Sequence, residues 1–499
     1  MKRIIASILV VSLILTFALF VMTGCGPKRQ AAADFVMPEG GFDTETPITI
    51  TFYHSMGAAL RDVLNTAIAD FNVLYPNITV EHESYGNYDG VRDQIKTEIS
   101  VGNQPNIAYC YPDHIALYNV AGAVQTLDVL IESEYGFTQE QIDDFVPGYY
   151  EEGRAFGDGK MYSLPISKST EVLYYNKTEF DNWAKIYNSE QLPDENGVLV
   201  DNPNYHNEAY NIKVPTTWEE MEDACKKIKA IYPTCIPLGY DSESNWFITM
   251  CEQYGSPYTS ATGENFLFNN ETNRNFVETF RTWYENKWVT TESLSGGYTS
   301  ALFTGESSSS STDSKVPAGT RCYMCIGSTG GATYQQPSQT NGVFEFEVGI
   351  TSIPQVNPAE PKVITQGPSV CIFKKDNAQE VLASWLFVKF LTTDHTFQGS
   401  VSMNNGYAPV IQSISENPAY ANFLASASTQ NIQAYAVKVA LEQSDAYYVS
   451  PAFNGSSVAR DQVGLLLQKC FTEPATNVDE MIAKAFKDAV DKCIFESGQ

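Results

Sequence analysis

The sequence has little positive charge and little histidine. Its 31 Lys and Arg residues stand against 59 Asp and Glu, which gives a formal charge of −28 at pH 7. A surface this acidic repels phosphate backbones, so we expect no nucleic-acid partner held by bulk charge. Only five His are present beside 29 Tyr, which argues against a His-rich metal site. We therefore expect neither a metal nor a cofactor.

Recognisable catalytic motifs are also lacking. The chain has no Gly-x-Ser-x-Gly elbow and no His-Glu-x-x-His sequence, which exclude two large hydrolase classes. Carboxylates are plentiful, but sequence spacing alone does not place two of them across a cleft. These observations favour a protein that is not an enzyme.

The composition is that of a folded protein. Hydrophobic residues make up 43% and aromatic residues 12% of the 499 residues, well above the content of a disordered acidic tail. The length exceeds that of one ordinary core, so we expect two or three domains.

The chain has one long apolar run, and it lies at the N-terminus. Lys2 and Arg3 precede an uninterrupted apolar stretch, residues 4–21, which ends in Met22-Thr-Gly-Cys25. Small residues before a cysteine favour a cleaved signal peptide over a signal anchor, the alternative reading. The pattern resembles a bacterial lipobox. We expect a lipoprotein signal peptide over 1–24, a lipidated Cys25, and a solvated tether over 25–46 that holds an exported protein at the membrane.

Nine cysteines follow the lipobox. Cys225 and Cys235 are close in sequence and form a candidate disulfide in an export-compatible compartment. Cys322 and Cys325 have the spacing of a redox or metal motif. They lie in a predicted strand, where positions three apart face opposite sides, so we favour structural core cysteines.

Hydrophobic periodicity alternates between strands and helices. We predict strands at 48–53, 77–80 and 107–111, with helices at 60–74 and from Val91 to about Gly102. Thr217 and Glu220 form a predicted capping box, and residues 380–391 a strongly apolar helix. Single helices between strands indicate an α/β fold with mainly parallel sheets. The composition predicts a surface insertion at residues 186–213 and a low-complexity loop at residues 307–311.

A colinear set of motifs resembles family-1 extracellular solute-binding proteins of ABC importers, from about residue 47 to 490. The resemblance implies a type II fold of two α/β lobes, joined by hinge crossovers, that close on ligand. The implied lobes are 47–168 plus 363–410, and 169–362 plus 411–499. The motifs are Phe52-Tyr-His-Ser-Met56, Tyr85-Gly-Asn-Tyr88, Gly102-Asn-Gln-Pro105, Ser169-Thr-Glu-Val-Leu-Tyr-Tyr-Asn-Lys177, Pro215-Thr-Thr-Trp218, Gly327-Ser-Thr-Gly330, Gln366-Gly-Pro-Ser369 and Gly406-Tyr-Ala-Pro409.

Within this family the chain is most similar to the glycerol-3-phosphate-binding branch, which shares the Phe-x-His-Ser-Met opening. One contact of that branch, a Glu, falls near Pro112 with Asp113 beside it, so the part of the ligand other than phosphate is not specified. Matching motif by motif implies six ligand contacts: Tyr88, Ser169, Ser328, Gly367, Tyr407 and Arg460.

The residues themselves leave alternatives open. Arg460 lies near the start of an apolar helix, where a cation opposes the macrodipole, so we infer anion binding over a salt bridge. The turn at 327–331 is either an oxyanion cradle or a plain tight turn, and it lacks the Lys of a nucleotide-binding loop. Trp246 is either a platform for a sugar ring or part of the core.

The expected function is that of a lipid-anchored, monomeric receptor that delivers a glycerol phosphate or carbohydrate to a membrane permease. A neutral oligosaccharide receptor of the same family is the nearest alternative. A secreted glycan hydrolase and a purely structural surface lipoprotein are the alternatives from other classes.

Overall fold

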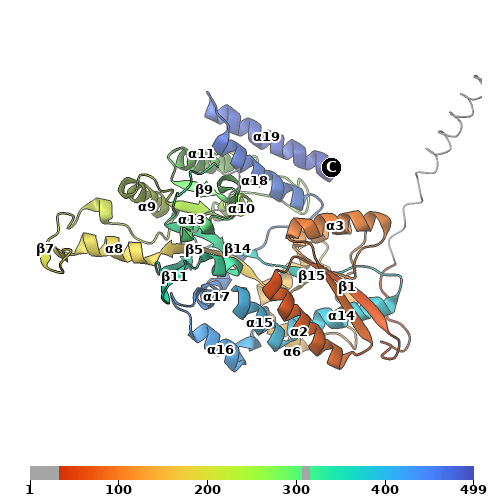
Figure 1. Cartoon of the computed structure of the whole chain (residues 1–499). Helices are drawn as coiled ribbons and strands as arrows, with labels where there is room; N and C mark the ends of the chain where they lie inside the picture. Colours follow the sequence, from red (N-terminus) through yellow and green to blue (C-terminus); the bar gives the residue numbers. More distant parts are fainter. Residues whose placement is uncertain (1–32, 306–314, 499) are drawn as a thin grey trace, which may run out of the picture.

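The computed structural model describes residues 33–305 and 315–498, and these contain two large β-sheets and two small two-stranded ones (Figure 1). The predicted signal peptide 1–24, the lipidated Cys25 and the low-complexity loop 307–311 lie outside the described residues. Within the described ranges, no helix combines the length and the apolar character that a membrane span requires.

The first sheet has the strand order β2-β1-β3-β15-β4. Helix α14 packs on it through a fully buried face that includes Trp385 and Phe387, and α2 adds Leu64 and Phe71 to the same core. The elements of this part are β1 (Ile48–His54), α2 (Ala58–Leu74), β2 (Ile78–Ser84), α3 (Tyr88–Val101), β3 (Ile107–Cys110), α4 (Pro112–Asn119), α5 (Asp128–Ile131), α6 (Gln139–Asp144), α7 (Pro147–Glu151), η1 (Glu152–Arg154), β4 (Leu164–Pro165), β15 (Ser369–Ile372), α14 (Ala378–Thr393), α15 (His395–Asn405) and η4 (Ser413–Glu416).

The second sheet has the order β16-β14-β5-β10-β8-β9, with β13 also paired to β5. The remaining elements are β5 (Ser169–Asn176), α8 (Lys177–Asn188), β6 (Gln191–Pro193), β7 (Leu199–Asp201), η2 (Glu208–Tyr210), α9 (Trp218–Ile231), β8 (Leu238–Tyr240), α10 (Glu243–Gln253), α11 (Glu271–Glu285), β9 (Val289–Thr291), α12 (Glu292–Ser295), α13 (Ser300–Thr304), β10 (Met324–Ser328), η3 (Thr329–Gln335), β11 (Gln339–Thr340), β12 (Val343–Phe344), β13 (Val348–Ser352), β14 (Val363–Gln366), α16 (Pro418–Ala425), α17 (Ile432–Glu442), η5 (Ser444–Ala446), β16 (Tyr447–Tyr448), α18 (Ser456–Thr472) and α19 (Val478–Ser497).

The local predictions are confirmed. The three N-terminal strands and the helices between them form where expected, α3 ends at Gly102 in the left-handed conformation, and Thr217 and Glu220 make the capping box of α9. The insertion 186–213 contains the exposed hairpin β6–β7, which projects away from the rest of the molecule in Figure 1.

The predicted α/β fold is confirmed, but both large sheets mix parallel and antiparallel pairs where mainly parallel ones were expected. β15 runs antiparallel to β3 and β4, and β5 runs antiparallel to β10, β13 and β14. Both strands follow a direct crossover from the other sheet, at residues 166–168 and 367–368. Because no helix intervenes, the rule that a helical crossover returns a parallel strand does not apply. Residues 363–366, expected in the first lobe, pair with β5 and β16 of the second sheet.

The two crossovers touch at Gly367, which has φ +93°. A Cβ at this position would lie 2.8 Å from Cα of Lys168, so only glycine lets the backbones approach this closely. Lys168 and Glu152 form a fully buried ion pair beside this contact, and Lys168 Nζ also donates to Ser369 Oγ at 3.1 Å. The two crossovers between the sheets are therefore closely packed against each other.

The prediction of a solvated tether is wrong for residues 34–43. Phe35 and Phe42 are buried in the first core, and the amide of Phe42 donates to Tyr135 Oη at 2.9 Å. Asp34 pairs with Lys374 at 2.6 Å. Burial of the two aromatic side chains, together with this hydrogen bond and ion pair, offsets part of the entropy that the segment loses on ordering.

The predicted disulfide is also wrong: Cys225 and Cys235 are free thiols. Cys225 faces the core from α9, and burial raises the pKa of its thiol well above the ordinary value, so it stays protonated and unreactive. Cys322 and Cys325 are buried core residues as predicted. Across the described part of the chain, no group of three or more His, Cys, Asp or Glu could hold a metal ion.

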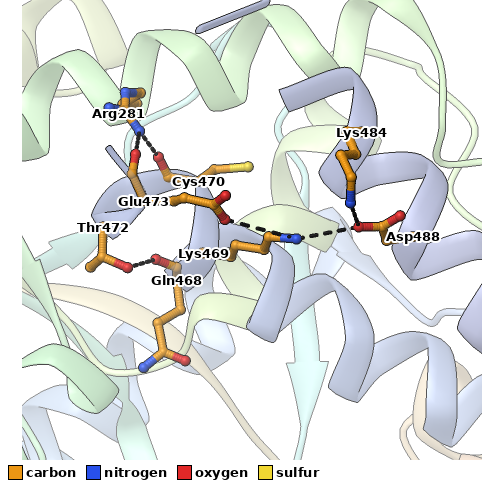
Figure 2. A network of polar contacts seen from close by, with 8 residues as sticks. All are labelled: Arg281, Gln468, Lys469, Cys470, Thr472, Glu473, Lys484 and Asp488. Atoms are coloured by element: carbon orange, nitrogen blue, oxygen red, sulfur yellow. Dashed lines mark hydrogen bonds and ion pairs between the residues drawn. The ribbon is translucent and has the colours of Figure 1, made fainter. Parts of the chain in front are cut away.

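A polar network fixes the C-terminal end of α18 against α11 and α19 (Figure 2). Arg281 Nη1 donates to the carbonyls of Cys470 and, at 3.0 Å, Glu473, where an unpaired helix end favours a cation. Lys469 pairs with Asp488 of α19 at 3.3 Å. Arg460 lies at the opposite, N-terminal end of the same helix.

Candidate functional site

A cleft lies where the carboxyl ends of the parallel strands of both sheets meet, the usual binding position in open α/β sheets. The first sheet contributes residues 111–113, which follow β3, and also Glu152. The second part contributes residues 364–366 of β14, the segment 449–451, Ser456 and Arg460. Pro112 and Asp113, where the related branch has its Glu, both line this cleft.

Arg460 is held by an amide. Its Nη2 donates to Asn245 Oδ1 of α10, and its backbone carbonyl accepts from Ser244 Oγ at 2.9 Å. Among the described residues, no carboxylate forms an ion pair with Arg460. The direct hydrogen-bond partner of the guanidinium is thus a neutral amide and not a carboxylate. The arrangement therefore favours anion binding over the salt-bridge reading.

Asn245 is in turn fixed by a buried carboxyl. Its Nδ2 donates to Glu171 Oε1 at 3.0 Å, and Tyr240 Oη donates to Glu171 Oε2 at 2.6 Å. Burial raises the pKa of Glu171 to about 7, although these two hydrogen bonds and the nearby Arg460 oppose the shift. The side chains from Tyr240 to Arg460 thus form one connected polar network.

Four tyrosines gather on the side of the first sheet. The ring of Tyr88, at the start of α3, stacks on Tyr109 with centroids 5.7 Å apart and lies 4.5 Å from Tyr111. Burial and the neighbouring Tyr109 and Tyr407 raise the pKa of Tyr88 well above its ordinary value. Tyr111 lies within electrostatic reach of both Tyr407 and Arg460. Of these four tyrosines, Tyr111 lines the cleft together with Arg460, while Tyr88, Tyr109 and Tyr407 lie close to Tyr111.

Ser169 and Ser328 meet at the base of the second sheet. Ser328 Oγ donates to Ser169 Oγ at 3.1 Å and accepts from the amide of Gly330 at 3.1 Å. Ser328 caps the 3₁₀ helix η3, so its own turn already uses the Gly330 amide. The structure therefore favours the tight-turn reading over an oxyanion cradle. The ring of Tyr407 lies over this turn, because a Cβ on Gly330 would be 2.8 Å from it.

A model of the family described as bacterial extracellular solute-binding protein matches residues 66–427. This chain belongs to that family. The sn-glycerol-3-phosphate-binding periplasmic protein UgpB of Shigella dysenteriae serotype 1 and that of Escherichia coli K12 are both 28% identical to it over 195 residues. Each match covers 39% of this chain and 38% of the relative, so it spans about two fifths of the relatives' length.

Solved structures share the fold of this solute-binding protein at low identity. UgpB from Mycobacterium tuberculosis in complex with glycerophosphocholine has a TM-score of 0.66 at 16% identity, covering 90% of this chain and 98% of that one. The GacH receptor of Streptomyces glaucescens, solved unliganded and with acarbose, has a TM-score of 0.65 at 15% identity, covering 91% and 100%. These likenesses establish the two-lobed fold.

Of the seven predicted site residues, Arg460 lines the cleft and the other six lie outside its lining. Trp246 is fully buried in the second core, stacked 4.9 Å from Tyr240, so its reading as a sugar platform is wrong. The polar run before it, 241–245, carried the useful signal, because its last residue Asn245 holds Arg460. Gly367 is buried in the crossover.

The sequence reading also missed Glu171 and Tyr111. Glu171 lies in the motif 169–177 and Tyr111 in the predicted strand 107–111. In both segments the local sequence pattern does not distinguish a site residue from a core residue.

Proposed function

We propose that this solute-binding protein is the receptor of an ABC importer and captures a glycerol phosphate or carbohydrate between its lobes. A phosphate ester is the preferred ligand. The observation that carries this preference is the guanidinium of Arg460, held in the cleft by a neutral amide. The names of the curated relatives support the same ligand class.

The surrounding residues suit the rest of such a ligand. Tyr88 and Tyr407 offer ring surface for carbon atoms and hydroxyls for oxygen atoms, and Ser169 and Ser328 add paired hydroxyls. Asp113 supplies a carboxylate that accepts hydrogen bonds from ligand hydroxyls. Contacts to both lobes stabilise the closed form, and only this differential binding shifts the population.

The proposal includes export and anchoring through lipidated Cys25, action as a monomer, and delivery of solute to permease subunits. The Met22-Thr-Gly-Cys25 pattern supports the anchor. Replacing Cys25 with Ser should release the protein from the membrane fraction if the lipid alone retains it.

The decisive experiment replaces Arg460 with Ala and measures affinity by calorimetry for sn-glycerol 3-phosphate, glycerophosphodiesters and maltotriose. Loss of a charge-assisted, bidentate contact of about 3 kcal/mol should weaken phosphate-ester binding at least 100-fold. Arg274→Ala is the matched control, since Arg274 bonds within its own helix α11. Undiminished affinity of Arg460→Ala for phosphate esters would contradict the assignment.

The same panel tests the alternatives. A neutral oligosaccharide receptor would bind maltotriose and keep that affinity in Arg460→Ala. A glycan hydrolase would turn over a chromogenic glycoside, whereas a receptor shows only saturable, stoichiometric binding. A purely structural lipoprotein would show no thermal shift with any of these solutes.

A further inference from the structure

One carboxylate of the cleft belongs to a buried ion pair. Glu152 lines the same cleft as Arg460, and its side chain pairs with Lys168 of the first crossover. Lys168 is fully buried, Glu152 is 5% exposed, and only Glu152 belongs to the lining. The cavity is small, about 60 Å³, so a solute that enters it lies within reach of both Glu152 and Arg460.

The hydrogen bonds to this carboxylate fall on one of its two oxygens. Lys168 Nζ and Ser369 Oγ both donate to Glu152 Oε2, the serine at 3.1 Å. The ammonium group also donates to Ser369 Oγ at 3.1 Å and to the carbonyl of Gly367 at 3.3 Å, which uses all three of its protons. Within the described part of the chain, both bonds to the Glu152 carboxylate end on Oε2. Its Oε1 therefore remains available as an acceptor.

Stability alone does not account for an ion pair at this position. The desolvation of two buried charges cancels most of their attraction, and an apolar pair of similar volume is often at least as stable. A carboxylate oxygen that faces a ligand cleft has a direct use, because it accepts hydrogen bonds and does not donate them. The ligand group that fits Oε1 is therefore a hydroxyl or an ammonium group.

Lys168 decides between these two groups. An isolated carboxylate in the cleft would repel the ligand anion that Arg460 attracts. The ammonium group beside Glu152 cancels its charge, so Oε1 accepts a hydrogen bond without that repulsion. A neutralised carboxylate also gives a ligand ammonium group little charge to pair with, so a hydroxyl is the matching donor. Asp113, the other carboxylate in the lining, forms no ion pair with any described residue.

We propose that Glu152, neutralised by Lys168, accepts a hydrogen bond from a hydroxyl of the ligand whose anionic group meets Arg460. The inference rests on the proposed function, and it narrows the ligand to anionic esters that carry a free hydroxyl. The carboxylate is held by Lys168 of one crossover and by Ser369, directly after the other. A ligand bound in this way connects α18 of the second lobe to both crossovers.

The test compares two phosphate esters of equal chain length by calorimetry, sn-glycerol 3-phosphate and n-propyl phosphate, which lacks the hydroxyls. Wild type should bind the glycerol ester at least ten-fold tighter, the effect of one hydrogen bond to a charged group. In Glu152→Met/Lys168→Met an apolar pair replaces the ion pair, so no uncompensated charge is left. This double variant should bind n-propyl phosphate as tightly as wild type, and its preference for the glycerol ester should be about ten-fold lower.

A second variant covers the case in which the double variant does not fold, which thermal unfolding reports. Glu152→Asp keeps a negative charge beside Lys168 but retracts the carboxylate by one methylene, so it should lower the preference as well. Arg154→Met is the matched control. It breaks a different ion pair of the same 3₁₀ helix, with Asp128 at 2.8 Å, and should leave the preference unchanged.

An unchanged preference in the folded Glu152 variants, or an equal loss of affinity for both esters, overturns this proposal. A preference that disappears in Asp113→Asn but persists in the Glu152 variants also overturns it, because the hydroxyl then belongs to Asp113. Equal affinity of wild type for the two esters overturns this proposal alone, since Arg460→Ala tests the phosphate assignment separately. Binding of neither ester by wild type overturns both.

Discussion

At the residue scale, Arg460 is held by Asn245, a buried side chain that does not itself line the cleft. Asn245 is 2% exposed and spans from Glu171 to the guanidinium. An arginine without such a partner samples many rotamers and must be ordered on binding, at a cost of about 1–2 kcal/mol. Asn245 is therefore a positioning residue for the proposed anion contact.

Replacing Asn245 with Ala should raise the Kd for sn-glycerol 3-phosphate about 5- to 30-fold, in line with that entropy cost. Asn245→Asp should be at least as harmful, because the new carboxylate pairs with Arg460 and competes with the ligand anion. Asn188→Ala serves as the control, since Asn188 only bonds to the carbonyl of Ala184 on the exposed end of α8. Calorimetry gives the Kd and thermal unfolding without ligand reports folding; an unchanged Kd in both Asn245 variants would remove the positioning role.

At the scale of elements, helices α3 and α18 meet across the two lobes. Arg92 of α3 pairs with Asp461 of α18 at 3.5 Å and with Asp89 of its own helix at 2.9 Å. Asp461 follows Arg460 directly, so the pair lies next to the proposed anion site. Because the partners belong to different lobes, their interaction exists only when the lobes meet.

We expect Arg92 and Asp461 to stabilise the closed, ligand-bound form by about 0.5–1 kcal/mol, the usual size for a partly exposed ion pair. Each single substitution also changes the electrostatic potential at the anion site. The measurement is therefore a double-mutant cycle, in which the ligand Kd is compared for Arg92→Gln, Asp461→Asn and the double variant. A coupling of about 2- to 5-fold is expected. Asp488→Asn, which breaks pairs within one lobe, should affect stability but not Kd. Strict additivity in the cycle would show that the helices do not help to hold the lobes together.

The same scale shows which features of this molecule local sequence can predict. The strands and helices between β1 and β3 follow from periodicity, and the start of α9 follows from one capping box, because each depends on residues a few positions apart. The direction of β5 and the pairing of β14 depend on strands more than a hundred residues away. No local pattern encodes such partners.

The residues of the candidate site also fall into those that the sequence can predict and those that it cannot. The family motifs indicated Tyr88, Tyr407 and Arg460. Arg460 lines the cleft, and Tyr88 and Tyr407 lie close to Tyr111, which also lines it. The motifs could not separate Trp246 from Asn245, neighbours on one helix that are both buried. Only the three-dimensional position of α18 decides that the amide meets the guanidinium while the indole stays among core rings.

At the scale of the whole molecule, the acidic composition includes carboxyls that the fold buries wholly or partly. The chain carries a formal charge of −28, and burial raises the pKa of four of these carboxyls. The values are about 7 for Glu171 and Glu292 and about 6 for Asp241 and Asp461. Each of these groups holds its proton more tightly in the folded protein than in the unfolded chain.

This arrangement predicts that the protein is more stable at pH 5 than at pH 8. For Glu171 the folded pKa of about 7 exceeds its ordinary value of 4.5, so its contribution is fully present below pH 4.5 and lost as the pH rises through 7. The shift corresponds to at most about 3 kcal/mol. Self-repulsion of the net negative charge acts in the same direction and weakens with salt.

The measurement is urea unfolding at pH 5 and pH 8. High ionic strength suppresses the general repulsion, so the remaining change in unfolding free energy reports on the buried groups. Glu171→Gln is neutral at every pH, so the fall in unfolding free energy between these values should shrink by up to about 3 kcal/mol. The control Glu278→Gln changes an exposed carboxyl on α11 and should leave the fall unchanged. A fall of equal size in wild type and Glu171→Gln would mean that Glu171 is ionised throughout this range, and that its negative charge permanently offsets the positive charge of Arg460.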